Sequence, residues 1–196
     1  YIPPSPGDAG GAIGAAILCS NESDIKSKKN IHYYTDQYLG TKIVDNNLHN
    51  LINKRIDKKK NDENITLEFV EDEKILIDKI AKNIFQNNIV GWFQGRMEWG
   101  PRALGNRSIL ANPCNPDMKK IINSKIKRRE SFRPFAPSIL YEKVSEWFEN
   151  SIDVPYMSIV LKLKKNKLGK IPAVTHIDGT GRLQTVKASS NYLYYE

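Results

Sequence analysis

The chain has 196 residues, of which 40% are hydrophobic and 27% are charged, and its formal net charge is +8. These values are ordinary for a globular protein, and the length suits one domain or one domain plus part of another. No run approaches the roughly 20 apolar residues of a membrane span, so the sequence argues against a membrane protein. Only Cys19 and Cys114 are present, far apart, which argues against a disulfide framework or a Cys-based zinc site and indicates a cytoplasmic location. The chain starts at Tyr1 rather than at Met, as expected for the middle of a longer protein.

The first half of the chain predicts one close-packed helix and a charged linker. Small residues dominate residues 6–19, which predicts a tight turn at Gly7-Asp8 and then a helix. Residues 21–30 are polar and typical of a loop. Residues 54–64 are almost all charged or amide side chains, as expected of a linker or a solvated surface.

The second half predicts alternating helices and short strands. Apolar residues recur at helical spacing over residues 72–87, and residues 89–93 then predict a short buried strand. Asn115-Pro-Asp117 predicts a helix start, because a cap residue is followed by Pro and an acid. The predicted buried face of that helix consists of Met118, Ile121, Ile122 and Ile126. Further strands are predicted at 136–140, 156–163 and 182–186, with a turn at 166–170. This order predicts an α/β or α+β fold.

Positive charge is concentrated in the second half. Residues 1–88 contain 12 Lys and Arg against 13 Asp and Glu, whereas residues 89–196 contain 18 against 9. Seven of the eight arginines lie between Arg96 and Arg182. Because a planar guanidinium group suits carboxylates and phosphates, this concentration predicts an anion site.

Residues 91–108 carry the strongest functional signal. Four glycines and one proline are too many for a regular helix or central strand, so they predict a shaped loop that leaves the strand at Phe93. Arg96, Arg102 and Arg107 alternate with the glycines, an arrangement suited to holding phosphates through charge-assisted contacts and backbone N–H groups. The alternative is a structural loop whose arginines pair with acids, and only Glu98 is close in sequence.

Residues 123–137 form a second basic cluster. Lys127, Arg129 and Arg133 lie where the predicted helix ends and a Pro-stiffened segment begins. A helix C-terminus attracts cations, so capping explains part of this charge. We expect anion binding by Lys127 and Arg129, leave Arg133 open between the two explanations, and expect Phe132 and Phe135 to pack inward.

A third candidate is the segment 171–186, in which His176 and Asp178 flank a turn at Gly179 and Arg182 follows. The His-x-Asp pair is compatible with a metal site, a proton relay or a loop hydrogen bond. The loop hydrogen bond is favoured for the pair alone. Arg182 beside it makes the lining of a catalytic site competitive.

The turn Gly7-Asp8-Ala9-Gly10 is the weakest of the candidates. Ahead of a helix of small residues, it is compatible with a nucleotide phosphate at the helix N-terminus or with Asp8 as a metal ligand. An N-capping Asp in a tight turn gives the same pattern.

Together these segments resemble the carbamoyltransferases of the nodulation-protein-U and antibiotic-carbamoylation type. The resemblance is carried by residues 91–109, 126–137 and 172–186, and residues 6–16 and 38–40 are also similar. It covers most of the chain outside a variable stretch near residues 45–70.

The resemblance implies two modules. Residues 1–44 would be the C-terminal tail of a Kae1-like domain of the actin/Hsp70 type, and residues 45–70 a variable linker. Residues 71–196 would be a YrdC-like (Sua5-like) domain, built on a twisted mixed sheet with helices and incomplete at its C-terminus.

In such enzymes the YrdC-like domain converts carbamoyl phosphate and ATP to carbamoyl-adenylate. The Kae1-like domain passes the carbamoyl group to a hydroxyl of a small molecule or sugar, with a bound divalent metal, Fe or Mg. The resemblance therefore implies an O-carbamoyltransferase (EC 2.1.3.-) that uses ATP as co-substrate.

Carried over by position, Lys127 and Arg182 would contact the carbamoyl-phosphate or carbamoyl-adenylate group, with His176 as a further catalytic candidate. The pocket for carbamoyl phosphate and ATP would also include Arg96, Arg102, Arg107, Ser108 and Arg129. Asp8 would be a metal ligand, with Gly7 and Gly10 beside the nucleotide of the Kae1-like domain.

Two alternatives stay open. The His-rich metal ligands of the family and its Leu-Asn-Thr-Ser-Phe-Asn segment are missing, so we expect this chain to be inactive alone. An RNA-binding YrdC-like module would explain the positive half. The arginines, however, lie in Gly-rich loops rather than along a stripe with stacking aromatics, which argues against nucleic acid.

Overall fold

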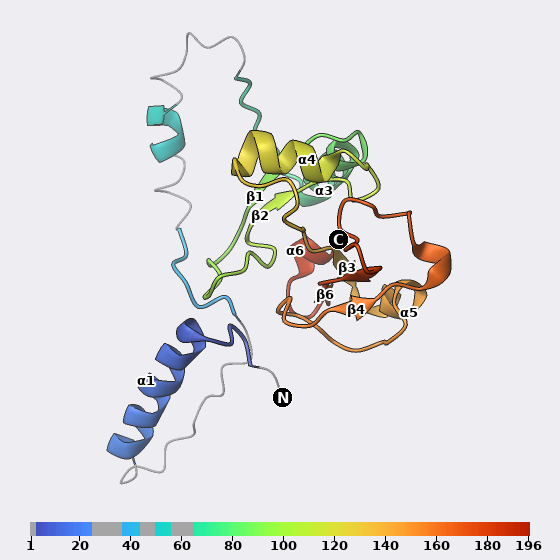
Figure 1. The fold of residues 1–196 in the computed structure, drawn as a ribbon. Helices are drawn as coiled ribbons and strands as arrows, with labels where there is room; N and C mark the ends of the chain where they lie inside the picture. The colour runs from blue at the N-terminus through green and yellow to red at the C-terminus, as the bar shows by residue number, and fades with distance from the viewer. Residues whose placement is uncertain (1–2, 25–36, 44–49, 56–64) are drawn as a thin grey trace.

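The computed structural model of the protein describes residues 3–24, 37–43, 50–55 and 65–196. Residues 50–55 are helical. The named elements, in chain order, are α1 (Asp8–Asp24), α3 (Glu73–Phe85), β1 (Val90–Phe93), β2 (Arg107–Leu110), α4 (Met118–Ile121), the π-helix η1 (Ile122–Lys127), β3 (Ser138–Leu140), the 3-10 helix η2 (Tyr141–Lys143), α5 (Val144–Trp147), β4 (Leu161–Lys162), the 3-10 helix η3 (Lys165–Lys167), β5 (Thr180–Gly181), β6 (Gln184–Val186) and α6 (Tyr192–Tyr195). The elements from α3 onward gather into one body, and α1 projects from it (Figure 1). Among the helices of the described residues, none is long and apolar enough to cross a membrane.

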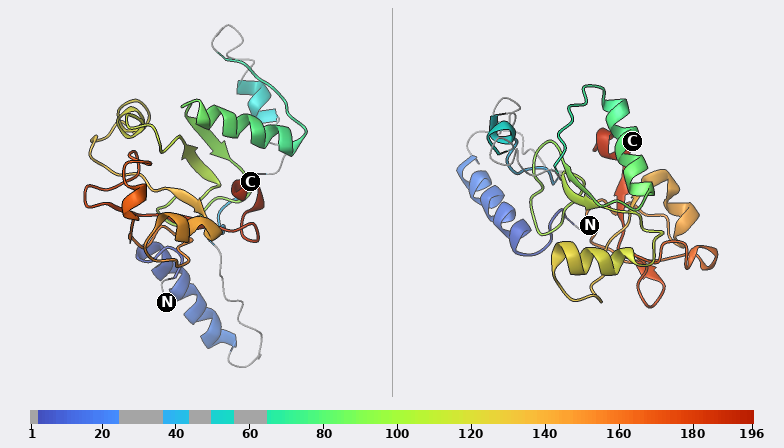
Figure 2. Two further views of the ribbon diagram at one scale, coloured as in Figure 1. Left: turned by 90° about the vertical axis from the view of Figure 1, so that its right-hand side faces the viewer. Right: turned by 90° about the horizontal axis from the view of Figure 1, so that it is seen from above.

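Three two-stranded sheets form the strand content of this body. β1 and β2 are antiparallel, with Trp92 opposite Ser108 and Phe93 opposite Arg107. β4 and β5 are also antiparallel, whereas β3 and β6 are parallel. The β1–β2 sheet lies between α3 and α4 (Figure 2). The predicted mixture of helices and strands is confirmed as an α+β arrangement with small sheets. The larger twisted sheet, the Kae1-like tail and the domain boundaries stay predictions.

The first predicted helices lie close to their predicted positions in the chain. α1 begins at Asp8, directly after Gly7 with its φ of 107°, and it runs to Asp24, so the loop predicted from residue 21 is wrong over four residues. Most of the predicted linker, residues 56–64, lies outside the described residues. α3 confirms the predicted helix, and the Asp72 side chain caps it by accepting hydrogen bonds from the N–H groups of Lys74 and Ile75.

Several predictions about burial and strand length are wrong. β1 forms, but its side chains alternate between half-buried and exposed. The strand predicted at 156–163 is reduced to Leu161–Lys162, because Met157 has a φ of 51° that interrupts the extended backbone. The strands predicted at 136–140 and 182–186 are shortened to Ser138–Leu140 and Gln184–Val186, and η3 confirms a turn near residue 166.

The helix predicted after Asn115 changes character halfway. Met118 and Ile122 are buried as predicted, but Ile126 is 48% exposed. The reason is η1, whose wider turn shifts each later side chain relative to α-helical spacing. Asn123 takes the buried position instead and is fully enclosed.

Two apolar clusters hold the body together. The larger consists of Val144, Phe148, Val154, Leu161, Leu163, Ile171, Val174 and Leu183. The smaller consists of Met118, Ile122 and Ala173. Phe135 packs against both clusters, as expected, whereas Phe132 is 75% exposed and the prediction for it is wrong.

Candidate functional site

A cavity of about 540 Å³ lies where the two apolar clusters meet the β1–β2 sheet. One part of its wall is apolar and comes from α3, β2 and α4, with the Trp92 ring of β1. The hydroxyl-bearing residues Ser108, Ser138 and Tyr194 line it as well. Its charged lining residues are Arg102, Lys119, Lys127, Arg129, Arg182 and Glu196. The cavity therefore combines an apolar wall with an excess of positive charge.

Three arginines from distant parts of the sequence face this cavity together. The pKa of Arg182 is lowered, first by burial and then by the positive charges of Arg102 and Arg129. Within the described residues, Arg102, Lys127 and Arg182 form no ion pair. Like charges brought together in a half-buried site repel one another, and a bound anion would relieve that repulsion.

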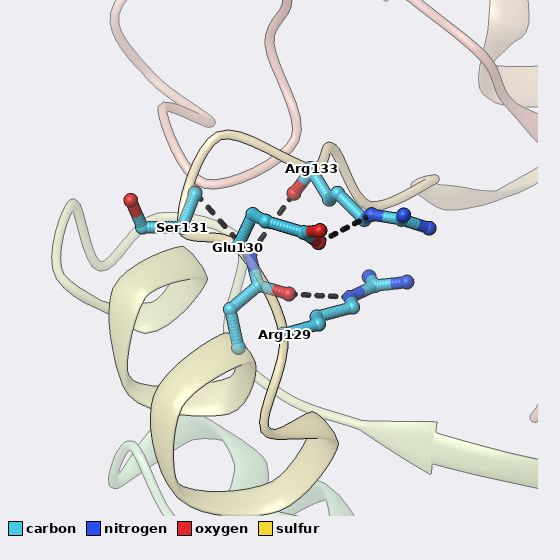
Figure 3. A network of polar contacts seen from close by, with 5 residues as sticks. Arg129, Glu130, Ser131 and Arg133 are labelled. Carbon is cyan, nitrogen blue, oxygen red and sulfur yellow. Dashed lines mark hydrogen bonds and ion pairs between the residues drawn. The ribbon is translucent and has the colours of Figure 1, made fainter.

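Arg129 is positioned by the buried amide of Asn123. Its Nε donates to Asn123 Oδ1 at 2.7 Å, and its guanidinium group stacks on Phe135 at 4.9 Å. Asn123 Nδ2 in turn donates to the carbonyl oxygens of Ser131 and Arg133, at 3.3 and 3.0 Å. Arg128 has a φ of 48° and reverses the chain after η1, so that the carbonyl groups of Ser131 and Arg133 return to Asn123. Figure 3 shows Arg129, Glu130, Ser131 and Arg133 of this segment with their polar contacts. The π-helix thus creates the support for a cavity arginine.

Arg133 has a different role from Arg129. Its Nε donates to Glu130 Oε2 at 2.8 Å, and both side chains are about half exposed. The pKa of Glu130 is lowered, chiefly by a backbone hydrogen bond and then by the charge of Arg133. Arg133 does not line the cavity, so its charge is used in a surface ion pair.

The arginines of the segment 91–108 separate into different environments. Arg102 lines the cavity. Arg107 instead donates to the carbonyl oxygens of Gln94, Gly95 and Asn106, and its guanidinium group stacks on Phe93 at 3.6 Å. Arg96 is exposed and pairs through its backbone with Lys42. The structure therefore brings Arg102 and Ser108 of this segment to the cavity, and leaves Arg96 and Arg107 outside it.

Glu98 does not neutralise any of these arginines. It is only 7% exposed, and its Oε1 accepts hydrogen bonds from the backbone N–H groups of Leu104, Asn106 and Arg107. The structural alternative, in which Glu98 pairs with a neighbouring Arg, is therefore wrong. The carboxylate shapes the loop and leaves Arg102 available.

His176 and Asp178 are connected through Thr180. The Thr180 hydroxyl donates to Asp178 Oδ1 at 2.7 Å and lies 2.9 Å from His176 Nδ1, which therefore donates to it. Hydrogen bonds to Asp178 from the Thr180 hydroxyl and then from the Thr180 backbone N–H lower the pKa of Asp178. His176 Nε2 is buried and has no hydrogen-bond partner in the described part of the chain. Neither residue lines the cavity, so the favoured loop hydrogen bond is what the structure shows.

Gly7, Asp8 and Gly10 lie at the start of α1, away from the cavity lining. Gly10 packs tightly in the turn, since a Cβ there would lie 2.4 Å from the Ser5 carbonyl oxygen. No cluster of three or more His, Cys, Asp or Glu side chains suited to a metal ion occurs in the described residues, 3–24, 37–43, 50–55 and 65–196. Asp8 alone does not make a metal site, and its role as a ligand stays a prediction.

Sequence reasoning missed Trp92, Ser138 and Tyr194 as cavity residues. Trp92 Nε1 is buried with no acceptor among the described residues. Trp92 lies opposite Ser108 across the sheet, and strand alternation from Ser108 could have found it. Ser138 and Tyr194 share a hydrogen bond of 2.7 Å, and no sequence spacing connects them.

Comparisons with known proteins place this site in a family. The family described as Carbamoyltransferase C-terminus matches residues 81–196, which include every charged residue of the cavity. Over the whole chain, the sequence is 37% identical to the nodulation protein NolNO of Sinorhizobium fredii and 36% identical to NolO of Bradyrhizobium diazoefficiens, covering 28% and 34% of those proteins. It is 38% identical to an uncharacterized protein of Synechocystis, of which it covers 34%. The chain thus spans about a third of the length of the curated relatives it matches, and it belongs to the carbamoyltransferase C-terminus family.

Proposed function

We propose that the full gene product containing this chain is an O-carbamoyltransferase, and that the cavity binds carbamoyl phosphate and ATP. The observation that carries the proposal is the convergence of Arg102, Arg129 and Arg182 on one cavity, close enough for their charges to lower the pKa of Arg182. Membership of the carbamoyltransferase family makes carbamoyl phosphate the matching anion.

The two substrates are both polyanions, so bringing them together requires fixed positive charge. In the proposed reaction, water hydrolyses carbamoyl phosphate, so that a bond to the water oxygen forms, the bond to phosphate breaks, and carbamate, inorganic phosphate and a proton result. A carbamate oxygen then forms a bond to the α-phosphorus of ATP, and the bond to the leaving pyrophosphate breaks. Arg102, Arg129 and Arg182 would hold the phosphate oxygens and stabilise the charge that develops on the leaving groups.

The apolar wall of the cavity supports a nucleotide as the second ligand. Ile80 and Ile84 of α3 and the ring of Trp92 offer a surface for a flat base, next to the basic residues that would hold the phosphates. The volume of about 540 Å³ is within the range of ligand pockets. The arginines converge on one pocket rather than along an extended stripe with stacking aromatics, which favours a small molecule over RNA.

Transfer to the acceptor hydroxyl completes the proposed activity. The hydroxyl oxygen attacks the carbamoyl carbon of carbamoyl-adenylate, and AMP leaves. A divalent metal is proposed only for the Kae1-like domain, and none of the steps assigned to the cavity residues depends on it. The relatives NolO and NolNO are named as nodulation proteins. For this protein, we propose a hydroxyl of a small molecule or glycan as the acceptor.

The test is ATP–pyrophosphate exchange that depends on carbamoyl phosphate, measured on the full gene product. We expect exchange by the wild type and a loss of at least about 100-fold in Arg182→Ala, because a half-buried charged contact to the transition state is removed. Arg133→Ala is the matched control, since Arg133 pairs with Glu130 outside the cavity. Exchange at the wild-type rate in Arg182→Ala would refute the site.

A further inference from the structure

Glu98 is a buried carboxylate that the proposed chemistry does not use. Its Oε1 accepts from the N–H groups of Leu104 at 2.7 Å, Asn106 at 2.8 Å and Arg107 at 3.2 Å. Three N–H groups on one oxygen are a demanding arrangement, and a charged carboxylate satisfies it better than a neutral acceptor does. In the part of the chain that the structure describes, Glu98 forms no ion pair with a cationic side chain.

The hydrogen bond from Leu104 N–H to Glu98 closes the base of the segment 99–103. That segment contains Arg102, which lines the cavity. Arg102 forms no hydrogen bond or ion pair with any residue in the described ranges. Its place in the cavity therefore depends on the backbone that carries it, and Glu98 fixes both ends of that backbone.

Contacts on both sides of the segment leave the backbone little freedom. The Leu104 carbonyl oxygen accepts from Gln184 Nε2 at 2.9 Å and from the Tyr38 hydroxyl at 2.8 Å. The Trp99 N–H donates to the Gln37 carbonyl at 2.7 Å. Gly100 has a φ of 109°, and a Cβ there would lie 2.1 Å from Ser5 Oγ. The segment is thus held at residues 99–100 and at residue 104. Glu98 connects these two positions, because it precedes Trp99 in the chain and its side chain accepts a hydrogen bond from the Leu104 N–H group.

We propose that Glu98 is a positioning residue that holds Arg102 in the anion cavity. Glu98 itself does not line the cavity and acts through the loop. The inference rests on the proposed function of the same cavity. A purely structural role would make loss of Glu98 lower stability without acting through Arg102.

The experiment is a double-mutant cycle with Glu98→Gln and Arg102→Ala in the full gene product. Gln keeps the shape and an acceptor oxygen but removes the charge, so the fold is retained. The first readout is the affinity for inorganic pyrophosphate by titration calorimetry, and the second is the KM for carbamoyl phosphate in the exchange reaction. Glu146→Gln is the control, because Glu146 pairs with Lys143 on the surface, away from the cavity lining.

We expect each single substitution to weaken pyrophosphate binding about tenfold, with KM rising more than kcat falls. The double variant should also be about tenfold weaker rather than about 100-fold, because Glu98 acts only through Arg102. Additive losses, or wild-type affinity in Glu98→Gln, would overturn the inference.

The cycle separates this inference from the proposed function. Pyrophosphate binding with a non-additive cycle but no exchange that depends on carbamoyl phosphate would overturn the function and support the positioning role. Normal exchange with an additive cycle would overturn the positioning role alone. A wild-type protein that binds no pyrophosphate would overturn both.

Discussion

Trp92 carries a donor that the described residues leave unused. Its indole N–H is buried without an acceptor, while its ring lines the cavity beside Ser108. A buried donor without a partner costs about 1–3 kcal/mol, so a ligand that accepts this hydrogen bond recovers part of that cost. Because the nitrogen is inaccessible in the free protein, we expect nucleotide binding to expose it, and the hydrogen bond would then distinguish a nucleotide from a simple phosphate.

Trp92→Phe should weaken ATP binding about fivefold to tenfold, because the ring surface stays and one hydrogen bond is lost. The thermal midpoint of the free protein should stay the same or rise slightly, since an unpaired donor is removed. Titration calorimetry with ATP and a thermal melt measure the two effects. Trp147→Phe is the control, because Trp147 packs on the larger core cluster and not on the cavity. An ATP affinity equal to that of the wild type would contradict this role.

The sequence could identify candidate cationic residues, but it could not show which of them line the cavity. The concentration of arginines after Arg96 led to the hypothesis of an anion site. Arg102 and Arg182 are 80 positions apart in the chain, and only the fold brings them to one cavity. Arg107 was indistinguishable from Arg102 in the sequence, because the carbonyl acceptors that hold it come from the loop backbone.

Among the elements, those with strong local signals were predictable. α3 combines helical periodicity with the Asp72 cap, and both signals lie within the element itself. η1 lacks such a signal, since the same residues fit an α-helix and the wider turn becomes favourable only when Asn123 is enclosed by the segment 129–133. The strand predicted at 156–163 is interrupted at Met157, whose φ of 51° has no signal in the apolar pattern of those residues.

The importance of η1 can be tested at Asn123. Asn123→Ala removes the acceptor for Arg129 and the donor for two carbonyl oxygens in a fully buried site. We expect the free energy of unfolding to fall by about 2–3 kcal/mol in urea titrations, because the carbonyl oxygens lose buried partners. Affinity for pyrophosphate should fall as well, since Arg129 loses its support.

Ser124→Ala is the matched control for that experiment. Ser124 is the next residue of η1, but it is exposed and its hydroxyl only donates back to the carbonyl oxygens of Lys120 and Ile121 in the preceding turn. Its substitution should change the unfolding free energy by less than about 0.5 kcal/mol. Equal losses in the two variants would show that Asn123 has no special role in the element.

Over the whole molecule, the loop 94–106 joins the N-terminal segments to the cavity body. Met97 N–H donates to the Thr41 carbonyl at 3.1 Å, and Gly40 N–H donates to the Met97 carbonyl at 2.9 Å. Trp99 Nε1 donates to the Ala9 carbonyl of α1 at 2.8 Å. The same loop delivers Arg102 to the cavity, so the contacts of residues 37–43 and of α1 bear on the position of a candidate binding residue.

The close approach at Gly40 gives a direct test of this connection. A Cβ on Gly40 would lie 2.8 Å from both the Cβ and the carbonyl oxygen of Met97, so Gly40→Ala must push residues 37–43 away from the loop. We expect the Met97 and Trp99 amides to exchange with solvent at least about tenfold faster, and pyrophosphate affinity to fall through Arg102. Gly14→Ala is the control, because a Cβ there meets nothing within 4 Å and Ala favours the α1 helix. Hydrogen exchange followed by mass spectrometry distinguishes the two variants, and unchanged exchange at Met97 in Gly40→Ala would mean that residues 37–43 do not hold the loop in solution.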